Sequence, residues 1–288
     1  MKHFLLIPVF NDWKSLNKLI IKLNTTLKID KKIKNEILII NDNSSEKINL
    51  NLKKLRSISK IKIISLKKNL GSQKAIAIGL SYLKSIKDDF YITVMDGDGE
   101  DGPTRVKTML DVAIKNPNHI VASNRKKREE AFLIIFLYKL HLIITFLFTF
   151  KWITFGNFST FNKKNLKCLL SNNSSWYAHS SSVLKNCKVK NLYFKREKRY
   201  YDKSKLGIFS LMEHSLRVNT VFYKNIFIIT LIYLTILINL IDGNFKYIFL
   251  IGCLLFNFLV IFVKIKHWIK NLSKIRSYIK KIILFKTF

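Results

Sequence analysis

Residues 90–103 of this chain read FYITVMDGDGEDGP. The first half of this stretch is apolar, which predicts a buried strand, and carboxylates crowd into the residues that follow it. Such a cluster is costly unless a cation or hydrogen-bond donors gather there. The Asp-Gly-Asp spacing suits a divalent metal with oxygen ligands. An acidic, glycine-rich surface turn is the alternative interpretation.

The residues before this stretch alternate between strand and helix patterns. The predicted strands lie at residues 4–9, 36–40, 61–66 and 90–95, and the predicted helices lie at residues 13–27 and 74–83. Alternation at this spacing predicts a parallel sheet with helices on its faces, and ligands bind at the carboxyl ends of such strands. Three acidic clusters are therefore expected at one edge of the sheet, at residues 8–12, 41–44 and 96–101.

Composition narrows the class of protein. The chain has 288 residues, 49% of them apolar, with 51 Lys and Arg against 18 Asp and Glu, a net charge of +33. The apolar content excludes a disordered chain, and three widely spaced cysteines exclude a disulfide scaffold. The charge calls for an acidic partner such as nucleic acid, phospholipid headgroups or a phosphorylated substrate. Because no basic and aromatic recognition motif accompanies it, we expect no nucleic-acid partner.

Two long apolar runs predict a transmembrane hairpin. Asn225–Ile241 and Tyr247–Val263 carry no charge, and a short turn separates them. The alternative is a buried hairpin in a soluble bundle, but a chain of this length has no spare core to cover two helices that are apolar all round. The positive-inside rule then puts residues 1–224 and the basic C-terminal segment in the cytoplasm.

A third apolar stretch, residues 131–150, has a polar stripe. The stripe is formed by Tyr138, His141, Thr145 and Thr149. We interpret the stretch as a helix that lies in the membrane interface. If the helix crossed the membrane, residues 1–130 and residues 151–224 would lie on opposite sides of it. Both segments are expected to contribute residues to the same site, so they must lie on the same side.

The ordered motifs of the chain carry a family resemblance. They are Ile7–Asp12, Asn41–Ser44, Asn69–Gly71 with Lys74, Ala75 and Gly79, and Met95–Pro103. In this order they resemble the signatures of family 2 glycosyltransferases with the GT-A fold. Three later segments resemble the polyprenyl-phosphate (dolichol-phosphate-type) branch of that family: Asn124–Glu129, Gly156–Ser159 and Arg199–Lys205.

The resemblance covers roughly residues 4–265 and implies an architecture. The fold class is α/β, a GT-A (Rossmann-like) nucleotide-sugar-binding domain with an interfacial helix and a C-terminal two-helix transmembrane hairpin. The implied divisions are a GT-A domain at residues 1–220, including the interfacial helix at about 131–150, the hairpin at 221–265 and a basic cytoplasmic tail at 266–288. The protein would be a multi-pass protein of the inner (cytoplasmic) membrane with its catalytic domain in the cytoplasm. Relatives often assemble through their membrane helices, so a homo-oligomer is one expectation.

The resemblance also implies roles for individual residues. The donor, a UDP- or GDP-sugar, would bind Pro8, Asp12, Asp42, Ser44, Lys74, Asp96 and Gly97. Mg²⁺ or Mn²⁺ would be held by Asp96, Asp98 and Glu100. The acceptor phosphate would bind Arg125, Arg128, Arg199, Ser204 and Lys205. The catalytic residues would be Asp98, Asp96, Arg125 and Arg199. For any single basic residue, simple attraction to the membrane surface is the alternative.

One observation bears on the acceptor. From Ala131 through Arg196 there is no Asp or Glu, although relatives that glycosylate a sugar hydroxyl typically have a basic carboxylate in this region. A hydroxyl must be deprotonated, whereas a phosphate monoester is already largely dianionic near neutral pH. The pattern favours a polyprenyl phosphate acceptor, with Asp101 and Asp202 left open as bases. We expect the transfer to proceed by direct displacement, with inversion.

Departures from the family pattern keep two other functions open. Asn41, Asn43 and Glu100 stand where Asp, Gly and Gln are usual. One alternative is a membrane glycosyltransferase that uses a sugar hydroxyl in cell-surface polysaccharide synthesis, and the other is a degenerate, non-catalytic scaffold. We expect His179, in a polar segment, to be a surface residue.

Overall fold

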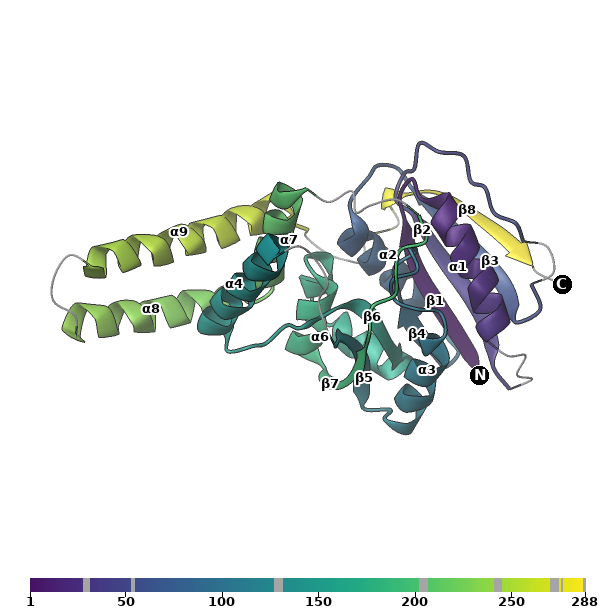
Figure 1. The fold of residues 1–288 in the computed structure, drawn as a ribbon, viewed down its shortest axis with the longest axis horizontal. Coiled ribbons are helices and arrows are strands. Elements are labelled where there is room, and N and C mark those ends of the chain that lie inside the picture. Colours follow the sequence, from purple (N-terminus) through teal and green to yellow (C-terminus); the bar gives the residue numbers. More distant parts are fainter. Residues whose placement is uncertain are drawn as a thin grey trace.

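One eight-stranded sheet organises the molecule in the computed structural model (Figure 1). The structure describes residues 1–27, 32–52, 55–126, 132–201, 207–240, 245–269, 275 and 277–286. The strands are β1 (Lys2–Val9), β2 (Lys34–Asn41), β3 (Ile58–Leu66), β4 (Phe90–Val94), β5 (His119–Arg125), β6 (Phe155–Asn162), β7 (Lys188–Phe194) and β8 (Ile279–Lys286). The helices are α1 (Trp13–Thr26), α2 (Ser72–Lys84), α3 (Arg105–Lys115), α4 (Phe132–Thr149), α5 (Lys163–Leu169), α6 (His179–Asn186), α7 (Ile208–Thr220), α8 (Tyr223–Leu240) and α9 (Phe245–Lys266), with a 3₁₀ turn at Asn173–Trp176.

The predicted strands and helices of the first hundred residues are confirmed, but the sheet is mixed rather than parallel. Its order is β7-β5-β6-β4-β1-β2-β3-β8, and β6 and β8 run antiparallel to their neighbours. Strand β5 ends at the carboxyl edge of the sheet, and β6 starts at that edge, where Phe155 pairs with Asn124. The chain therefore returns along β6 in the opposite direction.

Apolar side chains on alternate positions of the strands build a core on each face of the sheet. One face packs Leu6, Ile40 and Val94 against α2, and the other packs Leu5, Ile7 and Ile39 against α1 and α3. Parallel strands buried on both faces read as continuous apolar runs, which is why the strand signal in this chain is strong.

The segment expected as a basic cytoplasmic tail is partly a strand. Residues 279–286 form β8, which pairs antiparallel with β3 at the edge of the sheet. Ile283 and Phe285 are partly buried against the core, while Ile282 and Leu284 are 46% and 47% exposed.

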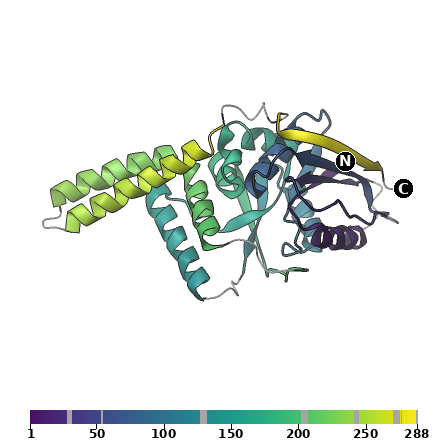
Figure 2. The ribbon, with the colours of Figure 1, turned by 90° about the horizontal axis from the view of Figure 1, so that it is seen from above.

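Helices α4, α7, α8 and α9 form a separate apolar cluster beside the sheet domain. Figure 2 shows α8 and α9 extending together away from the sheet, with α4 and α7 near their base. The chain turns by 84° between Phe209–Thr220 and Tyr223–Leu237. Phe148 of α4, Val221 and Ile226 share one buried cluster.

Two described helices are long and apolar enough to cross a membrane, Phe132–Thr149 and Lys246–Lys266, and the bent pair of α7 and α8 would make a third. The polar stripe of residues 131–150 faces protein. Thr145 and Thr149 are buried, and His141 Nδ1 lies 2.5 Å from Ser215 Oγ on α7. The surface that α4 leaves exposed is apolar except for Lys139, and it includes Phe132 at 84% exposure.

Gly79 tests the packing of α2 on the sheet. A methyl group on Gly79 would overlap Leu6 and lie 3.1 Å from Ile40 Cγ1, and both neighbours are fully buried. We expect Gly79→Ala to lower the free energy of unfolding by about 1–2 kcal/mol, because overpacking outweighs the better helix propensity of Ala. Thermal unfolding in detergent measures this. The control is Gly156→Ala, where the added methyl meets nothing within 4 Å, and equal stability of the two variants would contradict the packing.

Candidate active site

The loops that follow β1 and β2 brace each other at the carboxyl edge of the sheet. The Asn11 N–H donates to Ser44 Oγ at 2.9 Å, and Asn11 Oδ1 accepts the Ser45 N–H at 2.9 Å. Asp12 caps α1 by accepting the Ser15 N–H at 3.3 Å. These loops place the predicted donor residues Asp12 and Ser44 in one rigid corner.

Gly97 and Pro8 lie side by side at the same edge. A Cβ on Gly97 would lie 3.5 Å from the Pro8 carbonyl oxygen and 3.4 Å from Ile7 Cγ2. The loop after β4 therefore packs directly on the end of β1, at the edge of the sheet where the acidic clusters are expected.

Asp42 organises the start of α2. Its Oδ1 accepts the Leu70 N–H and its Oδ2 accepts the Gly71 N–H, both at 2.7 Å. The side chain is buried, and this burial raises its pKa to about 6 despite the two hydrogen bonds and the nearby charge of Lys74. The carboxylate predicted to contact a nucleotide base is thus already engaged by main chain, with lone pairs to spare.

The acidic loop, Asp96–Asp101, is closed by its own hydrogen bonds. Asp101 Oδ2 accepts the Asp96 N–H at 2.8 Å, and Asp98 Oδ1 accepts the Glu100 N–H at 3.0 Å. Burial, then the neighbouring carboxylates, raise the pKa of Asp96 and Asp101. The loop concentrates negative charge where the fold gives it little water, so it needs cationic partners.

Those partners come from residues 196–200, which we call the arginine segment. Arg199 Nη2 lies 2.5 Å from Asp98 Oδ2, and Arg199 Nε lies 3.5 Å from Glu100 Oε1. Arg196 forms an ion pair with Glu100. Main-chain bonds fix the register, because the Glu197 N–H donates to the Glu100 carbonyl and the Tyr200 N–H to the Asp98 carbonyl, both at 3.1 Å.

Tyr200 covers the acidic loop. Gly99 has a φ of +92°, and a Cβ there would overlap the Tyr200 ring, so both conformation and space require glycine. On its other side, the ring lies 5.1 Å from Lys18 Nζ and 4.6 Å from Lys22 Nζ of α1. The arginine segment is thus held between α1 and the acidic loop.

The donor chemistry of the acidic loop fits a divalent cation. Hard carboxylate oxygens are what Mg²⁺ and Mn²⁺ prefer, and Asp98, only 7% exposed, already attracts a guanidinium. Within the described residues, no three His, Cys, Asp or Glu side chains converge as a ready-made metal cage. A cation on Asp98 would replace Arg199, and Glu100 is held by Arg196 and Arg199.

A chain of amide side chains leads inward from Asp96. Asn157 Nδ2 donates to Asp96 Oδ1 at 3.0 Å, and Gln73 Nε2 donates to Asn157 Oδ1 at 3.0 Å. Gln73 Oε1 accepts the His179 N–H at 2.7 Å. The chain connects the acidic loop to the starts of α2 and α6.

His179 is not a surface residue, contrary to expectation. It is fully buried, its Nε2 lies 2.8 Å from Ser159 Oγ, and burial lowers its pKa to about 4. The surrounding serines made the segment read as exposed, whereas they line a buried turn.

The structure brings together only part of the predicted site. Arg199 pairs with Asp98 and Glu100, and Asp96 lies in the same loop, where the charge of Arg125 partly opposes the rise in pKa that burial causes. Lys74 lies apart from them, at the start of α2. Arg128, Asp202, Ser204 and Lys205 lie outside the described residues.

Sequence reasoning missed three contributors to this edge. Arg196 and Gln73 carried no motif signal, and Asn157 was noted only as part of a segment. Arg196 is the last residue of the stretch without Asp or Glu, and this position is the only feature of the sequence that distinguishes it.

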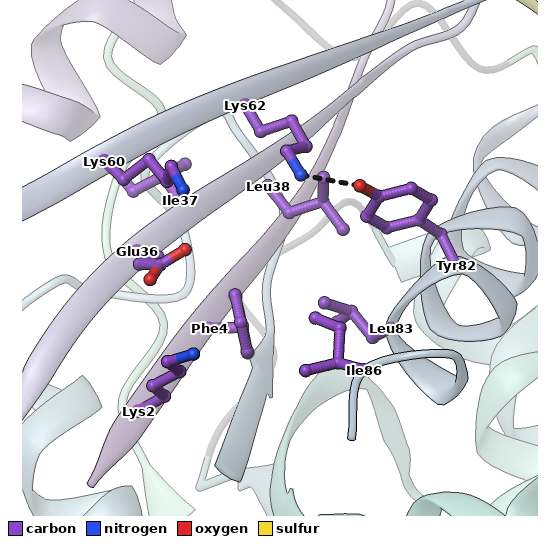
Figure 3. Close-up of a pocket in the computed structure, with 10 residues that line it drawn as sticks. All are labelled: Lys2, Phe4, Glu36, Ile37, Leu38, Lys60, Lys62, Tyr82, Leu83 and Ile86. Atoms are coloured by element: carbon purple, nitrogen blue, oxygen red, sulfur yellow. Dashed lines mark hydrogen bonds between the residues drawn. The ribbon is translucent and has the colours of Figure 1, made fainter. Parts of the chain in front are cut away.

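A cavity of about 220 Å³ lies at the opposite, amino-terminal edge of the sheet (Figure 3). Lys62 Nζ and Tyr82 Oη meet there at 2.6 Å. It lies against the starts of β1, β2 and β3, so it is separate from the acidic loop.

The chain is similar to one protein family and to several solved structures. The model of the family described as glycosyl transferase family 2 matches residues 4–183. Among solved structures, S. aureus TarS 1-349 in complex with UDP-GlcNAc is similar at 14% identity and a TM-score of 0.46, over 78% of this chain and 67% of that one. Glucosyl-3-phosphoglycerate synthase from Mycobacterium tuberculosis, in complex with Mn²⁺, UDP and phosphoglyceric acid, is similar at 11% identity and a TM-score of 0.49, over 78% of each chain. No curated protein sequence matches the chain.

Arg199→Gln tests the charge balance of the acidic loop. The change leaves Asp98 without its guanidinium, so we expect the free energy of unfolding to fall by about 1–2 kcal/mol. We also expect excess Mn²⁺ to raise the free energy of unfolding of the variant by more than it raises that of the wild type. Thermal unfolding with and without Mn²⁺ measures this. Arg105→Gln is the matched control, because Arg105 lies 3.8 Å from Glu197 at the far side of the same segment. No loss of stability in Arg199→Gln would contradict the ion pair.

Proposed function

This chain belongs to glycosyl transferase family 2, and we propose that it transfers a sugar, with inversion, from a nucleotide sugar to a polyprenyl phosphate at the cytoplasmic face of a membrane. Its activity is that of a glycosyltransferase. The acceptor and the membrane position are the parts that we propose, and each rests on a separate observation.

The state of the carboxylates carries the acceptor proposal. All four of the acidic loop are already engaged: Asp96 by Asn157, Asp98 by Arg199, Glu100 by the two arginines and Asp101 by the Asp96 main chain. The chain adds no Asp or Glu between residues 131 and 196. A sugar hydroxyl would need a free base there, whereas a phosphate monoester needs none.

The proposed reaction is a direct displacement. A phosphate oxygen of the acceptor forms a bond to the anomeric carbon while the bond from that carbon to the donor diphosphate breaks on the opposite face. The nucleoside diphosphate leaves with the bonding electron pair. Electrostatics and positioning supply most of the rate.

The residues of this chain manage the charge of that step. When bound, a Mg²⁺ or Mn²⁺ held by Asp98 and Asp96 would neutralise the two donor phosphates. Arg199 and Arg125 bind phosphate oxygens beside it, because a guanidinium forks onto phosphate as it does onto carboxylate. The pairing of Arg199 with Asp98 thus keeps that guanidinium at the reacting end until a phosphate arrives.

The donor lies over the corner formed by the first two loops. Pro8, Asp12 and Ser44 border it, and Gly97 adds no side chain that would block the approach. Asp42 accepts two N–H groups and retains lone pairs for the base.

The sheet topology supports the membrane arrangement. Helix α4 connects β5 and β6, which pair with each other. If α4 crossed the membrane, β5 and β6 would lie on opposite sides of it and could not pair. The helix therefore lies in the interface, with its apolar side toward lipid. The α8–α9 pair leaves from α7 and returns to β8, which pairs with β3, so it crosses an even number of times.

A transfer assay tests the proposed function. With labelled UDP- and GDP-sugars, Mg²⁺ and polyprenyl phosphate, we expect the purified protein to form an acid-labile labelled lipid, and Asp98→Asn to lower the rate by about 100-fold or more. The control Asp111→Asn, an exposed carboxylate on α3, should transfer as the wild type does. Transfer to a glycan hydroxyl but not to lipid phosphate would contradict the acceptor assignment.

Cysteine labelling tests the membrane arrangement. In intact spheroplasts, an impermeant maleimide should label Lys246→Cys, in the first turn of α9 at the outer end of the hairpin, whereas the exposed native Cys168 should react only after lysis. Equal labelling of both positions before lysis would contradict the topology.

A further inference from the structure

Two cations lie together at the start of α2, apart from the acidic loop. Arg217 of α7 reaches toward Gly71, where its Nη1 lies 3.9 Å from the position of a Cβ. Lys74, in the first turn of α2, has its Nζ 5.2 Å from the ring centroid of Trp176. The Arg217 Nη2 donates weakly to the Trp176 carbonyl at 3.4 Å, so one tryptophan orients both side chains.

Arg217 is buried and Lys74 is half-buried, and the carboxylates nearest to them, Asp42 and Glu213, are engaged by other groups. Arg217 is only 9% exposed, and its Nε has no hydrogen-bond partner within the described part of the chain. Glu213, one turn earlier on α7, is held by Lys266 at 2.8 Å and by His267 at 2.7 Å. Burial, with the charges of Arg217 and Lys68, lowers the pKa of Lys74 to about 8. Buried like charges of this kind call for an anion.

The end of α2 adds to their positive field. Helix α2 begins at Ser72 after Gly71, which has a φ of +85°, with no side-chain cap and no acidic residue in its first turn. The first N–H groups of a helix and its dipole favour an anion, above all a phosphate. Arg217 points at this helix end, and its Nε has no hydrogen-bond partner among the described residues. The helix end and this guanidinium can therefore bind one anion together.

The position of this site suggests which phosphate it takes. Arg217 lies on α7, which leads into the hairpin and exposes Phe209 at 87% and Met212 at 57%. On the other side, Gln73, next to Lys74, is linked through Asn157 to Asp96. A group bound here lies between the apolar helices and the acidic loop.

We propose that Lys74, Arg217 and the first turn of α2 bind the phosphate group of the lipid acceptor. This inference rests on the proposed function and moves Lys74 from the donor to the acceptor. The apolar chain of the lipid runs along α7 toward the hairpin, while its phosphate leaves water for the two cations and the helix end. Recognition is by charge and forked hydrogen bonding, so an alcohol of the same chain length lacks the essential group.

Direct binding tests the site without a sugar donor. The full chain in detergent is titrated with farnesyl phosphate, farnesol, inorganic phosphate and UDP. We expect farnesyl phosphate to bind at least about tenfold more tightly than farnesol or inorganic phosphate. Lys74→Met and Arg217→Met should each weaken farnesyl phosphate at least about tenfold and leave UDP unchanged, and Arg217→Lys should recover part of the loss. The control Lys107→Met removes one exposed charge on α3 and should bind as the wild type does.

The remaining outcomes separate this site from the rest of the account. Unchanged farnesyl phosphate binding in both Met variants would overturn the proposal, and weakened UDP binding alone would assign the cations to the donor. Inorganic phosphate binding as tightly as farnesyl phosphate would make this a free-phosphate site. If Arg217→Met does not melt cooperatively and so does not fold, the test rests on farnesyl phosphate binding by Lys74→Met, because Lys74 is only half-buried. Selective binding with no sugar transfer would sustain the site while the proposed function fails.

Discussion

The carboxylates between β4 and α3 have to be neutralised, and much of this structure follows from that constraint. Four acidic side chains lie within Asp96–Asp101 at a partly buried strand end, where water screens them little. The fold answers with the arginine segment, more than ninety residues later in the chain, whose side chains pair with Asp98 and Glu100. Its main chain docks on the same loop through the Glu197 and Tyr200 N–H groups. A cation or a phosphate that enters this site therefore competes with contacts that the protein already makes.

A second constraint is that the chain returns to the sheet domain after each apolar helical segment that the structure describes, α4 on its own and α8 with α9 as a pair. Helix α4 lies between paired strands, and the α8–α9 pair lies between α7 and the edge strand β8. The chain thus keeps its charged site and its apolar helices in contact through α7. Arg217 joins the two directly, because it lies on α7 and reaches the start of α2. Through Arg217, the apolar helices contact the sheet domain at the start of α2.

The first hundred residues could be predicted from the sequence because local pattern and tertiary role agree there. Strands β1 to β4 are apolar runs buried on both faces, and the polar loops follow them directly. Prediction failed where long-range contacts decide. The lysines in β8 read as a tail, although β3 pairs with that strand, and the serines around His179 read as surface, although they line a buried turn. The ion pairs of Arg196 and Arg199 join residues about one hundred positions apart, so no local pattern could reveal their geometry.

Hydrogen exchange at the Glu197 and Tyr200 amides tests the central claim most directly. The account predicts slow exchange at both amides in the protein alone, since each donates to a carbonyl of the acidic loop at 3.1 Å. It also predicts that Mn²⁺ with a nucleoside diphosphate changes this protection, because the cation and its phosphates draw Asp98 and Arg199 apart. Exchange at the rate of an open loop in the protein alone, with no response to Mn²⁺ and nucleotide, would contradict the claim that the arginine segment balances the acidic loop.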